Sequence, residues 1–210
     1  DNFESRPLGN LSAATLPWTT YTKIDPGYSY ISVNLGYGNS KGLTFVDSNN
    51  AGNSRISRNI SALKKGTVQF YLRAAANGSI GFRDNSSWVP YVCLGDMGSG
   101  YGMYSWNQST GVFTKIMSVT ANTWYDVYIS FDLNAGQNYF RVYVNDVLRR
   151  TEYLTGTFSM TNFSFLTFTN EVCSWADIDN VVVTALQPGY STAGEEGFEE
   201  FSDSTDSSTR

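Results

Sequence analysis

Two carboxylates, Asp177 and Asp179, lie two residues apart in the stretch SWADIDNVVVT near the end of the chain. Alternate residues of a strand point to the same face of a sheet, so these two side chains should share a face. Paired carboxylates of this kind can hydrolyse a glycosidic bond, bind calcium, or make the hydrogen bonds of a sheet edge. All three roles stay open at this point.

Histidine is absent from the sequence. This excludes Ser-His-Asp and Cys-His catalysis and histidine-ligated zinc. It leaves open a polysaccharide lyase in which a tyrosine acts as base and acid while an arginine neutralises a uronate carboxylate. The outward strand faces contain Gln69, Tyr71, Arg73, Tyr128, Arg141 and Tyr143. Among them Tyr71, Arg73, Arg141 and Tyr143 are candidate sugar-binding residues, and a lyase would need these four to converge in a groove. They form one surface if their strands are neighbours in the concave sheet; the alternative is a solvated face on which Tyr and Arg pair across strands.

Further aromatic residues lie among Gly, Ser and Asn in the stretches RDNSSW and GSGYGMYSWNQS. Sugars stack their C–H faces on aromatic rings, while amides and guanidinium groups take the hydroxyls. The alternative is that these rings fill the sandwich from its ends. The candidate sugar-binding residues in these stretches are Arg83, Trp88, Tyr101, Tyr104 and Trp106.

The elements that must position these residues are strands. Apolar and polar residues alternate over residues 67–74, 124–132 and 138–147, which is the pattern of half-buried strands. Turn signals separate the runs, and no amphipathic helix exceeds two turns. We predict ten to fourteen strands in an all-β, two-sheet antiparallel β-sandwich over residues 1–188. Trp124 and Trp175, which begin two of these strands, are expected in its core.

Residues 189–210 differ from the rest of the chain, because they are acidic and rich in Ser and Gly. They hold six of the 19 acidic and one of the 14 basic residues, which leaves the remaining body formally neutral. A neutral body argues against nucleic acid as a partner. The segment is expected to be a tail or linker, the start of a next repeat, or a strand added to a neighbouring subunit. No apolar run is long enough to predict a transmembrane helix.

Cysteines and glycosylation motifs bear on the location of the protein. Cys93 and Cys173 form either one disulfide, as in exported proteins, or two buried thiols. Six N-x-S/T motifs favour a secreted, extracellular glycoprotein. Their asparagines are Asn10, Asn59, Asn77, Asn85, Asn107 and Asn162.

Several motifs together resemble the concanavalin A-like jelly-roll superfamily, and more narrowly the laminin-G-like domains of secreted bacterial proteins. They are DNFES, Trp18, NTWYDVYISFDLNAGQNYFRVYVND and WADIDNVVV, and they cover roughly residues 1–186. The resemblance implies a jelly roll in which the first and last strands pair. It also implies a structural calcium ion bound by acidic residues; the alternative is that these residues only make turn and edge hydrogen bonds. The candidate calcium ligands are Asp1, Glu4, Asp177 and Asp179.

The same resemblance bears on catalysis. Laminarinase-type glucanases of this superfamily use an E-x-D-x-x-E strand, and here the third carboxylate is missing. We therefore expect a non-catalytic, extracellular carbohydrate-binding or adhesion module whose partner is a polysaccharide or glycan. The alternatives are a subunit of an extracellular fibre or surface assembly and a polysaccharide lyase, since this fold hosts many functions. Copies of the chain, or neighbouring domains of a larger protein, are further candidate partners.

Overall fold

A computed structural model describes residues 3–4, 9–10, 18, 20–23, 29–48, 54–84, 90–133, 138–156, 158–168 and 173–186. Within these ranges no helix is long and apolar enough to cross a membrane. The tail predicted at 189–210 lies outside the described residues, so its role stays a prediction. Asp1, Asn85 and Trp88 also lie outside them.

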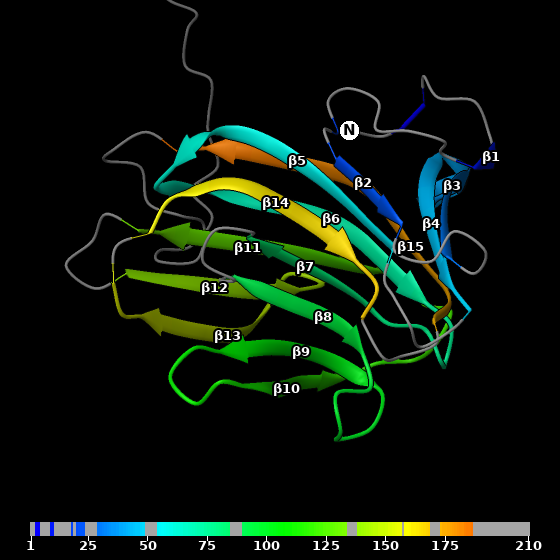
Figure 1. The fold of residues 1–210 in the computed structure, drawn as a ribbon. Helices are drawn as coiled ribbons and strands as arrows, with labels where there is room; N and C mark the ends of the chain where they lie inside the picture. Colours follow the sequence, from blue (N-terminus) through cyan, green and yellow to red (C-terminus); the bar gives the residue numbers. More distant parts are fainter. Residues whose placement is uncertain are drawn as a thin grey trace, which may run out of the picture.

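Fifteen strands of the described residues form two antiparallel sheets (Figure 1). Sheet A has the order β1 (Gly9–Asn10), β3 (Ser29–Leu35), β4 (Lys41–Asp47), β15 (Cys173–Ala185), β6 (Lys65–Ala74), β11 (Tyr125–Asp132), β12 (Asn138–Val144), β13 (Val147–Leu154). Sheet B has the order β10 (Val112–Ser118), β9 (Gly102–Asn107), β8 (Tyr91–Gly95), β7 (Ile80–Asp84), β14 (Met160–Leu166), β5 (Ser54–Leu63), β2 (Thr20–Lys23). The predicted all-β, two-sheet antiparallel sandwich is confirmed.

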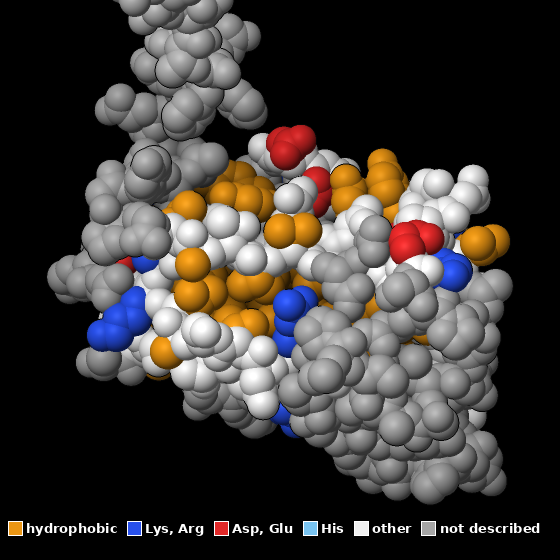
Figure 2. All heavy atoms as spheres, turned by 90° about the horizontal axis from the view of Figure 1, so that it is seen from above, with side chains coloured by type: hydrophobic (Ala, Val, Ile, Leu, Met, Phe, Trp, Pro, Cys, Tyr) orange, Lys and Arg blue, Asp and Glu red, His pale blue; other side chains and the backbone are white. Residues whose placement is uncertain are grey.

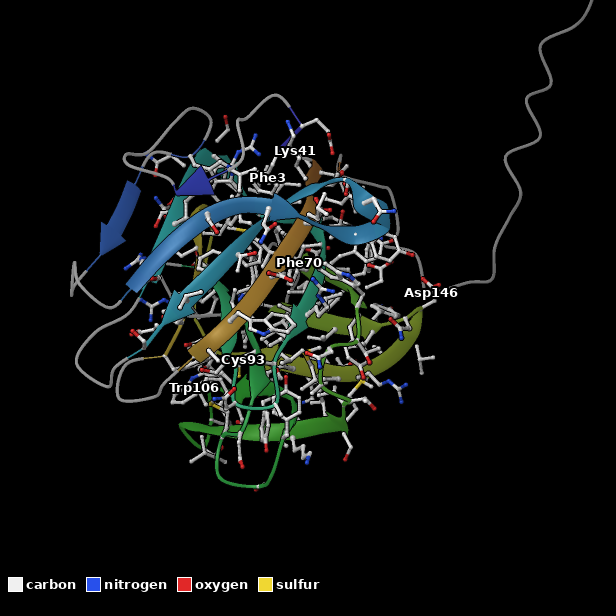
Figure 3. All side chains as sticks on the ribbon, turned by 90° about the vertical axis from the view of Figure 1, so that its right-hand side faces the viewer. Phe3, Lys41, Phe70, Cys93, Trp106 and Asp146 are labelled. Carbon is white, nitrogen blue, oxygen red and sulfur yellow. The ribbon has the colours of Figure 1, made fainter. Side chains whose placement is uncertain are left out.

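The core lies between the two sheets and follows the period of two. On β6 the apolar Phe70 is fully buried, whereas Tyr71 and Arg73 are only half-buried on the outer face. The Phe70 ring lies 5.2 Å from Phe82 and 4.9 Å from Phe165, both on sheet B, and Figure 3 places Phe70 near the middle of the molecule. Burial of a large apolar side chain such as Phe70 contributes about 1.5–3 kcal/mol. On the surface seen from above, hydrophobic side chains are exposed in the middle, and charged side chains lie among and around them (Figure 2).

The last strand lies inside sheet A instead of pairing with the first. β15 hydrogen-bonds to β4 on one side and to β6 on the other, whereas β1 pairs with β3. The expectation that first and last strands pair is therefore wrong for the described residues. This placement sets Asp177 and Asp179 directly beside the outward residues of β6.

The two cysteines do not form the disulfide that was one of the two alternatives. Cys93 on β8 packs with Tyr91 and Tyr104 on the outer face of sheet B. Cys173 on β15 packs in the core between the sheets. Both are buried thiols, and the backbone of sheet B separates them.

This placement predicts how the thiols react. We expect neither cysteine to be alkylated in the folded protein, and both to be alkylated in denaturant without any reductant, because burial alone protects them. Mass spectrometry after alkylation under the two conditions measures the result. A protein that takes up label only after reduction would contradict the structure.

Candidate functional site

The outer face of sheet A carries the four residues predicted to bind sugar or, in the alternative, to act in a lyase. Because β6, β11 and β12 are neighbours, Tyr71, Arg73, Arg141 and Tyr143 do share one face. They do not meet in one place, however. Arg141 on β12 pairs with Ser130 on β11, and Ser130 pairs with Thr67 on β6. Thr67 lies six residues from Arg73 along β6. At about 3.3 Å per residue this is roughly 20 Å, so no single groove contains all four side chains.

A depression with a volume of about 420 Å³ lies at the Arg73 end of this face. Strands β3, β4, β15 and β6 and the segment before β11 all contribute to its wall. Asn34, Leu35 and Asn122 are exposed there, whereas Asp177 is only 4% exposed. The lining residues are Asn34, Leu35, Thr44, Arg73, Asn122, Trp175 and Asp177.

Arg73 is the centre of the depression's contacts. Its Nε and Nη2 atoms donate to Oδ2 of Asp177 at 3.0 and 2.5 Å. Its guanidinium carbon lies 4.6 Å from the ring centroid of Trp124 and 5.2 Å from that of Trp175. Charge-assisted hydrogen bonds and cation–π contacts both restrict this group. The guanidinium is therefore held in one position between two indole rings and a carboxylate.

Asp177 is a structural carboxylate in this arrangement. Its Oδ1 atom accepts a hydrogen bond from Oγ1 of Thr44 at 2.6 Å, while Oδ2 accepts from Arg73. Burial raises the pKa of Asp177 above its ordinary value, and the hydrogen bonds from Thr44 and Arg73 act in the opposite direction. Because both oxygens already accept hydrogen bonds, Asp177 is badly placed to act as a nucleophile.

Asp179 holds a turn against the sheet. Its Oδ2 atom accepts hydrogen bonds from the backbone N–H of Tyr37 at 2.9 Å and from Oγ of Ser40 at 2.5 Å. The 3₁₀ turn η1 (Tyr37–Asn39) approaches so closely that a side chain at Gly36 would collide with Asp179. Asp177 and Asp179 thus share a face, as predicted, but each is engaged by a different part of the chain.

The calcium site stays a prediction. Glu4 accepts a hydrogen bond from the backbone N–H of Lys41 at 2.6 Å. The described residues contain no group of three or more His, Cys, Asp and Glu side chains that could hold a metal ion. Asp1, the remaining candidate ligand, lies outside these residues.

An aromatic ridge borders the depression. Tyr37, 41% exposed, stacks on Tyr71 with ring centroids 4.0 Å apart and an angle of 9° between the planes. Its ring also meets Trp124 edge-on at 6.0 Å. Burial raises the pKa of Tyr71, and the nearby Asp126 and Tyr37 raise it further. Tyr71 therefore keeps its proton at neutral pH, which opposes a role as a catalytic base.

The interpretation of Trp124 and Trp175 as core residues is wrong. Both are half-buried, and both contact Arg73 on the outer face of sheet A. The alternation in the sequence contained this signal for Trp124. Tyr125 points inward, so its neighbour Trp124 must point outward with Asp126. The sequence does not predict the positions of Tyr37, Asn34 and Asn122, because they depend on turns and strand ends that lack such a pattern.

The second predicted group of residues divides between the sandwich interior and the far face. Arg83 and Trp106 lie on the outer face of sheet B, where Trp106 meets Phe113 edge-on at 5.1 Å. Tyr104 is fully buried on that face. The Tyr101 hydroxyl donates to the backbone oxygen of Ala74 at 3.2 Å, and its ring packs against the main core.

Figure 3 shows this second face on the side away from the β12–β13 hairpin. Cys93 and Trp106 lie near each other there, and Asp146 of the hairpin lies on the opposite side. Burial raises the pKa of Tyr101 well above its ordinary value, as expected for a phenol enclosed in the protein. The described rings of this group are thus more enclosed than the ridge on sheet A.

The asparagines of the glycosylation motifs have varied surroundings. Asn59 on β5 and Asn162 on β14 lie side by side, and Nδ2 of Asn162 donates to Oδ1 of Asn59. Asn77 accepts from Oγ of Ser174 at 2.5 Å. Asn107 accepts from the backbone N–H of Ser109 at 3.0 Å within a turn. Glycosylation stays a prediction for these residues, for Asn10 and for Asn85, which lies outside the described residues.

Comparison with known proteins defines the fold. No family model matches the sequence, and no curated protein matches it. A solved structure named "Sialidase" is similar with a TM-score of 0.68 and 18% identity, over 88% of this chain and 18% of that chain. This chain thus spans less than a fifth of the sialidase chain.

Two further structures share the architecture. The GlcNAcα1-4Gal releasing endo-β-galactosidase from Clostridium perfringens has a TM-score of 0.54 and 10% identity, over 89% of this chain and 64% of that chain. The GH131 β-glucanase catalytic domain from Podospora anserina has a TM-score of 0.53 and 14% identity, over 83% of this chain and 87% of that chain. The chain has the concanavalin A-like jelly-roll fold implied by its motifs.

Proposed function

We propose that this domain is a non-catalytic carbohydrate-binding module that binds a neutral glycan in the Arg73 depression. The observation that carries the proposal is the set of rings around it: Tyr37 and Tyr71 form a stacked ridge, and Trp124 and Trp175 flank the guanidinium. Aromatic rings bind the C–H faces of sugars, and the exposed amides of the lining bind hydroxyls. The similar folds named as a sialidase, an endo-β-galactosidase and a β-glucanase support a carbohydrate ligand by analogy.

Charge favours a neutral glycan over a uronate. The positive charge of Arg73 is matched by Asp177 at 2.5 Å, and Asp179 lies on the same face. A uronate carboxylate would compete with Asp177 for the guanidinium and would meet a second carboxylate nearby. The cost of separating a largely buried ion pair opposes this exchange.

A binding role is also favoured over catalysis. Asp177 in the depression and Asp179 beside it accept hydrogen bonds from the chain itself, and the pKa of Tyr71 is raised. These groups position the rings and are poorly suited to transfer protons. An extracellular location is part of the proposal, supported by the glycosylation motifs, and the domain would then act within a larger secreted protein.

Affinity electrophoresis in gels containing neutral or uronate polysaccharides tests the proposal. We expect retardation by neutral polymers only, with no ultraviolet absorbance from an unsaturated product. Trp175→Ala should weaken binding about tenfold, since loss of one aromatic contact costs on the order of 1.4 kcal/mol. Retardation that disappears with a chelator would show that a metal ion contributes to the site.

Trp106→Ala on the outer face of sheet B is the matched control and should bind normally. Melting temperatures of both variants separate loss of binding from loss of folding. If Trp106→Ala lost binding and Trp175→Ala kept it, the site would lie on sheet B. Formation of an unsaturated product from a uronate polymer would replace the proposal with a lyase.

A further inference from the structure

We infer that the ligand is an extended glycan chain, and that it runs from the Arg73 depression across the outer face of sheet A toward Tyr143. This inference rests on the proposed function and adds the form of the ligand. It follows from what lies beyond the depression on strands β6, β11 and β12. Polar and aromatic side chains continue there in consecutive cross-strand rows.

The row next to the depression contains Tyr71, which faces Asp126 on β11. The following row contains Gln69, Tyr128 and Tyr143 on three neighbouring strands. The rings of Tyr128 and Tyr143 meet edge-on at 5.6 Å, and Nε2 of Gln69 donates to both oxygens of Asp126 at 3.0 and 2.9 Å. The two rows therefore combine rings with positioned hydrogen-bonding groups, which is the combination that sugars require.

Half-buried Arg141 and Tyr139 follow toward the edge of sheet A. The guanidinium carbon of Arg141 lies 4.7 Å from the ring centroid of Tyr139, and Tyr139 pairs with Tyr153 on β13. Tyr153 is 57% exposed, so an aromatic ring is accessible at this end as well. We call the set Tyr71, Gln69, Tyr128, Tyr143, Arg141 and Tyr139 the tyrosine track.

The length of the track decides between one sugar and a chain. Arg73 and Arg141 are separated by six residues along the strand direction, or about 20 Å. This is several times the length of a pyranose ring. A terminal sugar in the depression would leave the tyrosine track without contact, whereas an extended chain would contact both.

The experiment is titration calorimetry on the full chain with β-glucan and β-galactan oligosaccharides from disaccharide to hexasaccharide. We expect the affinity to rise about tenfold or more with length, as each added contact of about 1.4 kcal/mol contributes a factor of ten. Tyr143→Ala should lower the hexasaccharide affinity about tenfold and leave the disaccharide affinity unchanged. Tyr143→Phe keeps the ring and should retain most of the gain.

The outcomes separate this inference from the proposed function. Binding that is weakened by Trp175→Ala but does not depend on length would overturn the extended chain and leave the proposed function standing. A length effect unaffected by Tyr143→Ala and by Tyr128→Ala would also overturn it, because the chain would then take another path. If no oligosaccharide binds, both the inference and the proposed function fail.

Discussion

Replacing Arg73 by methionine is expected to lower the free energy of unfolding by about 2–4 kcal/mol and to abolish glycan binding. The side chain of Asp177 is only 5% exposed and would lose both hydrogen bonds from the guanidinium. A buried carboxylate whose partner is removed keeps its desolvation cost without the compensating attraction. The two indole rings would also lose the cation between them. Urea denaturation and calorimetry measure the two effects.

The loss of stability should depend on pH. Burial already raises the folded-state pKa of Asp177 above 3.8, and removal of Arg73 removes a lowering influence. A carboxyl with a raised folded pKa binds its proton more tightly when folded, so stability falls as the pH rises through that pKa. We therefore expect the deficit of Arg73→Met to be larger at about pH 7 than at about pH 4.

Arg150→Met is the matched control for this variant. Arg150 pairs with Glu152 at 2.5 Å, and the side chains are 28% and 6% exposed, against 29% and 5% for Arg73 and Asp177. The control should lose similar stability but keep its affinity for the glycan. Equal loss of binding in both variants would show that glycan binding is lost through reduced stability and not through lost contacts in the depression.

Replacing Phe70 by alanine is expected to cost about 3–5 kcal/mol of unfolding free energy. The ring is fully buried and packs against Phe82 and Phe165 across the two sheets. Its removal loses transfer free energy and leaves a cavity that the rigid sheets cannot fill. Urea denaturation measures this loss, and we expect the m-value to stay unchanged.

Gln69→Ala tests whether neighbouring side chains of β6 point to opposite faces of the sheet. Gln69 precedes Phe70 but points outward, where its amide donates to Asp126. We expect the free energy of unfolding to fall by about 1 kcal/mol or less, since the hydrogen bond is partly exposed. Comparable losses for the two variants would contradict the separation of core and outer face on β6.

The sequence by itself determined the strands and the direction of their side chains. The alternation on residues 67–74 and 124–132 assigned Phe70 to the core and Tyr71 and Arg73 to the outer face. It also contained the outward direction of Trp124, because Trp124 precedes the inward Tyr125. This information is local, because neighbouring side chains of one strand must point to opposite faces.

Only the tertiary structure decided which strands lie side by side. Arg73 and Asp177 are 104 residues apart in the chain and meet because β15 enters sheet A next to β6. The same strand order places the turn at Tyr37 against Tyr71. It also places Cys93 and Cys173 on opposite sides of sheet B. Strand order depends on the summed packing and hydrogen bonding of the whole chain against the entropy of closing long loops, and no single strand contains that information.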